Sequence, residues 1–282
     1  MPESPADGPN AAMIAYWNDS AGPSWVAAQE VLDAQLRPLG LAAMKALDPK
    51  PGERLLDVGC GAGETSLELA RRVGPSGAVL GADISAPLLA LARRRAEGAG
   101  LANASFKQTD AQTDGFEPVD GVFSRFGVMF FDDPTAAFLN LRHALKPGGR
   151  VVFICWRALA ENAWMTVPMM AVAPLLPAPP PAPQPGAPGP FAFADKDRVH
   201  AILEAAGFTH IHIHPHNEKI GGGDLDVAAR TTLSVGPVAM ALREHPALQD
   251  KMVAAVREAL KAHQGADGQV LLPSATWIVT AR

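Results

Sequence analysis

Hydrophobic positions from residue 54 onward alternate between short continuous apolar runs and segments of helical spacing. The apolar runs have the length of buried strands and lie at 54–58, 78–83, 104–109, 120–125 and 151–156. The helical segments between them, each ended by glycine or proline, lie at 64–73, 85–98 and 133–146. Strands that alternate with helices are typical of parallel βαβ units, so the pattern predicts an α/β fold with helices on both faces of the sheet.

The pattern changes at both ends of this region. The first ten residues are polar and proline-rich and predict disorder, whereas helical spacing at 12–47 predicts two helices. Beyond the fifth strand, the prolines of 168–190 predict an extended loop without regular structure. The remaining predicted elements are an amphipathic helix at 195–206, a sixth strand at 208–214, a helical insertion at 217–270 and a seventh strand at 275–281.

A glycine-rich turn follows the first strand, in the sequence Asp57-Val58-Gly59-Cys60-Gly61-Ala62-Gly63. Glycine lacks a Cβ, so a ligand can lie against such a turn. A dinucleotide fingerprint would need a further glycine at position 64, which is Glu64. Asp57 is placed to meet an ammonium group, and Asp83, which ends the second strand, is placed to accept hydrogen bonds from ribose hydroxyls. These features indicate a nucleoside with a cationic, zwitterionic tail, and S-adenosylmethionine fits that description.

Four segments resemble, in order and spacing, the motifs of class I S-adenosylmethionine-dependent methyltransferases, within the branch of the ubiquinone and menaquinone C-methyltransferases. They are Asp57–Gly63, Asp83, Thr109–Gln112 and Leu145–Arg150. The resemblance covers about residues 50–157 and implies a Rossmann-like sheet of seven strands, mostly parallel with strand seven antiparallel. It further implies a helical lid at 1–48 and a methyltransferase domain at 49–282, in which the loop at 168–190 and a cap at 217–270 shape access to the acceptor.

The resemblance also implies which residues form the site. Those expected to bind S-adenosylmethionine are Asp57, Gly59, Cys60, Gly61, Gly63, Asp83, Ile84, Asp110, Ala111, Ser124, Trp25 and Gln29. Residues after strands four and five flank the methyl group in this architecture, so the acceptor candidates are Phe126, Met129, Trp156, Arg157, Asn162 and Trp164. Arg125 and Arg157 suit an anionic acceptor, whereas the aromatic side chains suit an apolar one.

Methyl transfer from a sulfonium is an in-line displacement whose main requirement is orientation. A general base is needed only for an acceptor proton of high pKa, and Glu161 and Arg125 are the candidates for a catalytic role. The predicted enzyme methylates a small-molecule acceptor at O, N, S or C. Two alternatives stay open: an NAD-dependent oxidoreductase, which Glu64 opposes, and a non-catalytic nucleoside-binding protein with the same fold.

Composition narrows the class of partner and compartment. The net charge of −5 and the lack of a basic cluster argue against a nucleic-acid partner. The run Arg93-Arg94-Arg95 is predicted to lie on a solvated helix face. Two cysteines without CxxC spacing, no signal-peptide pattern and no long apolar run indicate a cytoplasmic protein without a membrane span. The alternating histidines of 210–216 favour a solvated strand face over a metal site, so no metal is expected. A homodimer is compatible with the sequence.

Overall fold

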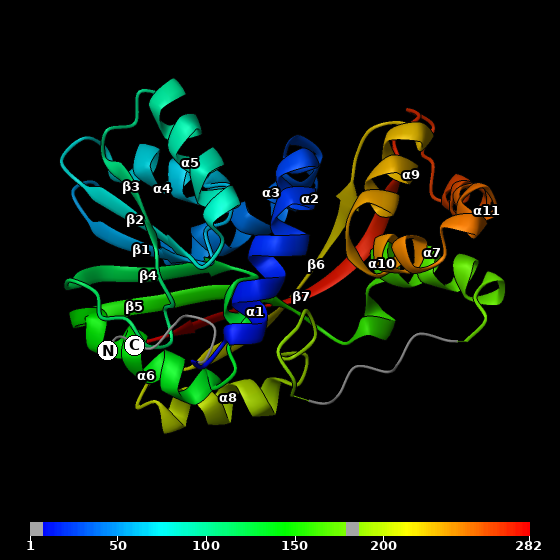
Figure 1. Cartoon of the computed structure of the whole chain (residues 1–282). Helices are drawn as coiled ribbons and strands as arrows, with labels where there is room; N and C mark the ends of the chain where they lie inside the picture. The colour runs from blue at the N-terminus through cyan, green and yellow to red at the C-terminus, as the bar shows by residue number, and fades with distance from the viewer. Residues whose placement is uncertain (1–7, 179–185) are drawn as a thin grey trace.

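A seven-stranded sheet forms the centre of the computed structural model, which describes residues 8–178 and 186–282 (Figure 1). The strands are β1 (Arg54–Val58), β2 (Ala78–Asp83), β3 (Ala104–Gln108), β4 (Val119–Arg125), β5 (Leu145–Trp156), β6 (His212–Gly221) and β7 (Leu271–Ala281). Their order is β3-β2-β1-β4-β5-β7-β6, in which β1 to β5 pair in parallel and β7 runs antiparallel to both neighbours. The predicted Rossmann-like sheet with an antiparallel seventh strand is confirmed.

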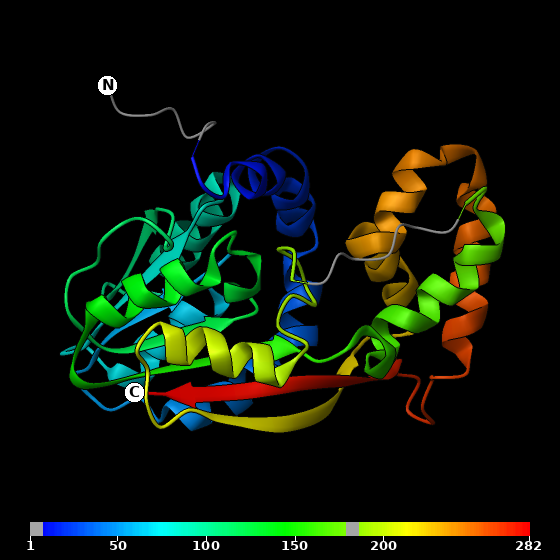
Figure 2. The ribbon, with the colours of Figure 1, turned by 90° about the horizontal axis from the view of Figure 1, so that it is seen from below.

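Helices cover both faces of this sheet. The helices α3 (Gln29–Leu47), α4 (Glu64–Val73) and α5 (Ala86–Gly98) lie on one face, and α6 (Pro134–Ala144) and α8 (Lys196–Ala205) lie on the other (Figures 1 and 2). The central strands are therefore apolar on both sides, as a doubly covered parallel sheet requires. The rings of Phe138, Phe153, Phe193 and Phe208 meet beneath α6 and α8 and fill the core there.

The N-terminal segment lies across the carboxyl ends of the strands. It contains α1 (Ala11–Ala15), a π-helical turn (Tyr16–Ser20) and α2 (Ala21–Ala27) before α3, so the prediction of two helices at 12–47 was wrong in number. Polar contacts fasten it to the end of β2, since the Ser85 hydroxyl donates to the Trp17 carbonyl at 2.9 Å and the Asn18 amide donates to the Ile84 carbonyl at 3.0 Å. The disorder predicted for residues 1–10 fails at Asn10, which is buried, and its first seven positions lie outside the described residues.

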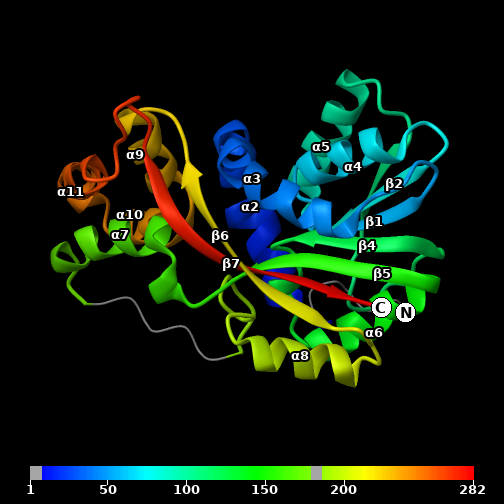
Figure 3. The same ribbon diagram turned by 180° about the vertical axis from the view of Figure 1, so that it is seen from behind.

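A second hydrophobic cluster forms at the ends of β6 and β7 that lie farthest from the rest of the sheet. It joins α7 (Ala163–Val172), α9 (Leu225–Ser234), α10 (Gly236–Glu244) and α11 (Gln249–Lys261), and the outer ends of β6 and β7 carry it (Figures 1 and 3). We call these four helices the cap. Met252, Val256 and Leu260 of α11 are fully buried in it, so the cap has a hydrophobic core of its own.

The proline-rich segment is more regular than its composition predicts. Helix α7 continues through Pro168 to Val172, and a 3-10 turn follows at Ala173–Leu175, so the predicted irregular structure was wrong for this part. The apolar side chains of α7 pack against α11 and β7, and this tertiary packing holds the helix despite the proline. Positions 179–185 of the predicted loop lie outside the described residues.

Strand β6 begins later and ends later than predicted. His210 has a positive φ of 50°, which interrupts the extended backbone, and the strand starts at His212. It then continues through Pro215, because an edge strand tolerates a residue that cannot donate to the ladder. Only His212, His214 and His216 therefore share the strand, and His210 lies before it. The described residues contain no group of three or more His, Cys, Asp or Glu side chains arranged to hold a metal ion.

Two further features bear on the class of protein. Cys60 and Cys155 are free thiols, and both are buried. In the part of the chain that the structure describes, no helix combines the length and apolar character needed to cross a membrane.

The aromatic core beneath α6 yields a test of the fold. Phe138 is fully buried, so Phe138→Ala should lower the free energy of unfolding by about 3–5 kcal/mol in urea denaturation. Its neighbour Leu139 is 43% exposed, and Leu139→Ala serves as the control, with an expected change within about 0.5 kcal/mol. Equal effects of the two substitutions would contradict this packing.

Candidate functional site

One large cavity lies at the carboxyl ends of β1, β2, β4 and β5. Its volume is about 400 Å³, within the range of small-molecule sites. The N-terminal segment contributes Asn10, Trp17 and Trp25 to its wall, and residues of the cap also line it. Because β1 is flanked by β2 on one side and by β4 on the other, the cavity occupies the topological switch point where open α/β sheets bind ligands.

The glycine turn forms the floor of this cavity. Gly61 has a φ of 53°, and a Cβ built on it meets no atom within 4 Å, so the turn presents bare backbone to the cavity at this position. A Cβ on Gly59 would lie 2.5 Å from the Cα of Gly127, so this glycine permits the ends of β1 and β4 to touch. Gly59 and Gly61 line the cavity. Gly63 packs against Ala92 and Phe106 instead, away from the cavity.

Asp57 lies below the floor and is fully buried. Its Oδ2 accepts hydrogen bonds from the hydroxyls of Thr65 at 2.7 Å and Ser66 at 2.6 Å, at the start of α4. Its Oδ1 is buried and has no hydrogen-bond partner among the described residues, so it can accept from a ligand or a bound water. Burial raises the pKa of Asp57 to about 6, although the two hydroxyls and Arg125 oppose that shift.

Asp83 lies on the cavity wall at the end of β2, beside Ile84. Its Oδ2 accepts the backbone N–H of Gly61 and its Oδ1 accepts that of Ser85, each at 2.8 Å. Both oxygens keep a free lone pair and a fixed orientation. Burial raises the pKa of Asp83, while the backbone N–H groups oppose this effect. Cys60 is buried behind the turn against Gly81 and does not line the cavity.

Asp110 lies on the wall after β3 and has a partner that local sequence patterns did not reveal. The side-chain amide of Asn10 donates to its two carboxylate oxygens at 3.1 and 2.8 Å, and also to Gln112 at 3.1 Å. The Asn10 carbonyl accepts the backbone N–H of Asp132 at 2.7 Å. An asparagine directly before a helix predicts an N-cap. The Asn10 side chain makes no cap bond, and it instead links the N-terminal segment to residues 100 and more positions away.

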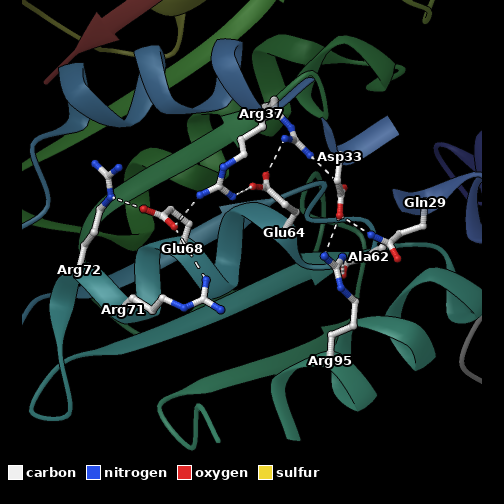
Figure 4. A network of polar contacts seen from close by, with 10 residues as sticks. Gln29, Asp33, Arg37, Ala62, Glu64, Glu68, Arg71, Arg72 and Arg95 are labelled. Carbon is white, nitrogen blue, oxygen red and sulfur yellow. Dashed lines mark hydrogen bonds and ion pairs between the residues drawn. The ribbon is translucent and has the colours of Figure 1, made fainter. Parts of the chain in front are cut away.

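Ion pairs connect α3 with α4 and α5 beside the glycine turn (Figure 4). Glu64, in the first turn of α4, pairs with Arg37 at 2.6 Å and with Arg125 at 2.7 Å. Gly40 of α3 lies against the Arg125 side chain, where a Cβ would be 3.1 Å away. Arg125 lines the cavity, but Glu64 already neutralises its charge, so the predicted anion-binding role for this arginine is not supported.

The same network changes the interpretation of two predictions. Arg95 of α5 pairs with Asp33 of α3 at 2.7 Å and donates to the Ala62 carbonyl at 2.6 Å, so it connects the lid to the glycine turn (Figure 4). The prediction that the arginine run is only a solvated face was wrong for Arg95. The amide of Gln29 donates to Asp33 at 2.5 Å and does not line the cavity, so the structure does not bring it to the expected cofactor position.

The residues proposed for the acceptor and for catalysis, together with Ser124, which was proposed for the cofactor, divide into two groups. Phe126, Met129, Trp156 and Trp164 line the cavity. The four that do not line it make other contacts, and they are Ser124, Arg157, Glu161 and Asn162. Ser124 donates to the Val58 carbonyl at 2.7 Å, Arg157 stacks on Trp277 and pairs with the exposed Glu161, and Asn162 is fully buried. The structure therefore supports neither Glu161 as a base nor Arg157 as a substrate contact.

Two further features of the site were not apparent from the sequence. The cap contributes much of the wall, and its lining residues include Met165, Met169, Thr231, Thr232, Val238 and Met240. Their helical spacing predicted helices, but it contained no signal for which face meets the cavity. Phe126 has a positive φ of 65°, which is rare for a bulky residue and costs on the order of 1–3 kcal/mol.

The sheet order, the glycine floor and the acidic residue that ends β2 agree with the resemblance to the class I S-adenosylmethionine-dependent methyltransferases. Residues 55–149 match the family model described as a methyltransferase domain, so this part of the chain carries such a domain.

Individual relatives agree with this assignment. Aklanonic acid methyltransferase DauC of Streptomyces sp. (strain C5) is 36% identical over 118 residues, 41% of this chain and 54% of that protein. The ubiquinone/menaquinone biosynthesis C-methyltransferase UbiE of Cellvibrio japonicus is 36% identical over 114 residues, 39% of this chain and 46% of that protein. The chain thus spans about half the length of these curated relatives. The YcgJ protein of Bacillus subtilis shares the fold, with a TM-score of 0.55, 17% identity and coverage of 86% of this chain and 96% of that one.

The raised pKa of Asp57 gives a test of the site's electrostatics. Between the ordinary value of 3.8 and about 6, the folded protein binds this proton more tightly than the unfolded chain, so stability falls as pH rises through that window. The unfolding free energy of the wild type, minus that of Asp57→Asn, should therefore fall by up to about 3 kcal/mol from pH 4 to pH 7. A pH-independent difference in denaturant titrations would contradict a buried, proton-binding Asp57.

Proposed function

We propose that the chain transfers a methyl group from S-adenosylmethionine to a small, largely apolar acceptor. The observation that carries this proposal is the continuity of the cavity. Its wall runs from Gly61 and Asp83 on the sheet to Thr231 and Met240 on the cap. A cofactor on the glycine floor and an acceptor beneath the cap would share one continuous space, which in-line transfer requires.

The residues present fit the cofactor. The open space above Gly61 accepts a ligand against bare backbone, and the buried, unpartnered Oδ1 of Asp57 supplies an acceptor for the ammonium group, through a bound water if the group does not reach it. The fixed carboxylate of Asp83 has lone pairs for two ribose hydroxyls. Asp110, held by Asn10, supplies an acceptor for the adenine amine, while Trp17 and Trp25 cover the nucleoside from the lid.

Glu64 supports this cofactor over a dinucleotide. Its carboxylate occupies the first turn of α4, where a dinucleotide would place its pyrophosphate against the helix N-terminus. The carboxylate is fixed there by Arg37 and Arg125. A pyrophosphate would have to compete with this carboxylate for the end of the helix, whereas S-adenosylmethionine carries no phosphate.

The reaction on this proposal relies on orientation rather than on acid–base chemistry. Bound S-adenosylmethionine supplies an electrophilic methyl group that its positive sulfur already activates. Among the described residues, the cavity wall contains no His, Lys, Glu or Cys; its titratable acidic groups are Tyr16 and the carboxylates of Asp83 and Asp110, which bind the cofactor on this proposal. The chain then aligns the acceptor and excludes water, and the acceptor brings a nucleophile that needs no strong base.

The lining of the cap side supports an apolar acceptor. The hydroxyls of Thr231 and Thr232 donate to the carbonyls of Val227 and Ala228, at 2.9 and 3.0 Å, and so are already satisfied. Arg125 is paired, and Arg157 lies outside the cavity. The cap is accordingly the part of the domain that selects the acceptor. The buried free thiols of Cys60 and Cys155 suit a reducing compartment, which supports a cytoplasmic protein.

Calorimetric titration of the purified protein tests the cofactor directly. S-adenosylmethionine and S-adenosylhomocysteine should each bind with a Kd on the order of micromolar, and NAD should not bind. Asp83→Ala should weaken S-adenosylmethionine by about tenfold or more, because a ribose acceptor is lost. Binding of NAD alone would overturn the proposal. Binding of S-adenosylmethionine with no methyl transfer to any acceptor would favour a non-catalytic nucleoside-binding protein.

The glycine floor allows a matched pair of variants. Gly61 and Gly100 have φ values of 53° and 66° and open space at the Cβ position, but only Gly61 lines the cavity. Alanine at either position should cost about 1–2 kcal/mol of stability, because both adopt left-handed backbone. Only Gly61→Ala should weaken S-adenosylmethionine, by at least tenfold. If both variants bind the cofactor like the wild type, the floor is not at Gly61.

A further inference from the structure

Three aromatic side chains from different parts of the chain form a row in the cavity. Phe126 follows β4, Trp156 ends β5, and Trp164 lies in the first turn of α7, and all three line the cavity. The rings of Phe126 and Trp156 are parallel, with centroids 4.1 Å apart and planes 6° apart. The rings of Trp156 and Trp164 have centroids 4.8 Å apart at an angle of 40°. We call these three residues the aromatic row.

The open aromatic surface belongs to the two outer members of the row. Trp156 is buried, with a ring contact to each of the other two residues. Phe126 and Trp164 are only partly buried, and both border the cavity. A flat ring system that enters the cavity can therefore stack on Phe126 or Trp164, while Trp156 supports them from within.

Backbone geometry holds Phe126 in place. Its φ of 65° is left-handed, which a phenylalanine adopts only when the surrounding structure imposes it. Its backbone N–H donates to the Ile154 carbonyl at 3.0 Å, and the next residue, Gly127, packs against Gly59. The contacts of β4 with β5 and with the glycine turn therefore fix the direction in which this ring points.

A buried hydrogen bond holds Trp164. Its indole N–H donates to the Oδ1 of Asn162 at 3.1 Å, and the same oxygen accepts the backbone N–H of Ala275 at 2.9 Å. The Asn162 amide donates in turn to the carbonyls of Arg157 and Ala158, at 3.3 and 3.1 Å. The polar atom of Trp164 is thus already satisfied by protein, and the face of its ring is what it offers to a ligand.

From this arrangement we propose that the aromatic row is the seat of a flat, conjugated ring of the acceptor, which it holds by stacking rather than by charge or hydrogen bonds. The role of the bound ring as methyl acceptor rests on the proposed function. Binding of the ring by the aromatic row does not require the cofactor. Near the aromatic row, Arg125 is paired with Glu64, and the hydroxyls of Thr231 and Thr232 already have hydrogen-bond partners. The cavity can therefore recognise a ligand here by apolar contact and ring stacking.

A matched pair of probes tests this selectivity by calorimetry, with no cofactor present. 2-Naphthol is flat and conjugated, and decahydro-2-naphthol has the same ring skeleton and hydroxyl but is saturated and puckered. Stacking on Phe126 and Trp164 should make 2-naphthol bind about tenfold more tightly than decahydro-2-naphthol. Equal affinity, or no binding of 2-naphthol up to its solubility limit, would overturn the proposal.

Variants of the row then assign the selectivity to its residues. Trp164→Leu and Phe126→Leu should each reduce the ratio of the two affinities to about threefold or less, while Trp164→Phe should retain most of it. Trp277→Phe is the control, because Trp277 is held by the Ala194 carbonyl and does not line the cavity. A ratio unchanged in Trp164→Leu and Phe126→Leu, with both variants folded by circular dichroism, would place the ring elsewhere.

The outcome is separable from that of the cofactor titration. If 2-naphthol binds more tightly than decahydro-2-naphthol but S-adenosylmethionine does not bind, the aromatic row binds flat rings as proposed. The proposed methyl transfer is then wrong. If S-adenosylmethionine binds but the two probes bind equally, the methyltransferase assignment stands and the aromatic seat is wrong.

Discussion

The site depends on the close approach of two backbone segments, Gly59 at the end of β1 and Gly127 after β4. A side chain on Gly59 would lie 2.5 Å from the Cα of Gly127, so the two strand ends can meet only because that position has none. Ser124 fastens the same junction, since its hydroxyl donates to the Val58 carbonyl and accepts the Gly127 N–H. From this junction the glycine floor faces the cavity, and Phe126 is held in its left-handed conformation. The glycine floor and the first ring of the aromatic row thus share one structural origin.

Partly buried ion pairs connect α3 to this floor. Asp33 and Arg37 of α3 pair with Arg95 and Glu64, and Glu64 also holds Arg125 at the cavity wall. Removing one partner would leave another partly buried charge unpaired, which typically costs more than the pair contributes. The pairs therefore restrict α3 to one position relative to the glycine turn. The region before α3 is held differently, by the neutral amide of Asn10 and by the carbonyls of Ile84 and Trp17.

The sequence predicted most of the sheet but less of the site. Strands β1 and β2 and helix α4 were predicted with the bounds that they have, because apolar runs, glycines and an N-terminal glutamate mark them locally. Gly59, Gly61, Asp83 and Asp110 follow strands, so topology alone brought them together. Asn10, the pairing of Arg125 with Glu64 and the helix through Pro168 depend on partners far along the chain, and no local pattern encodes those. For the same reason Arg157, Glu161 and Asn162 were assigned to a pocket that they do not line.

The cap is attached to the sheet through the ends of β6 and β7 and the start of α7, all of which lie beyond residue 149, where the family match ends. The cavity wall therefore joins residues inside the family match to residues outside it. Substitutions in the cap can alter the space around the aromatic row without altering the backbone contact of Gly59 with Gly127. Such a division lets the side chains of the cap vary while the glycine turn keeps its geometry. On the proposed function, the cap's own side chains are then a better guide to the acceptor than the acceptors named for the relatives.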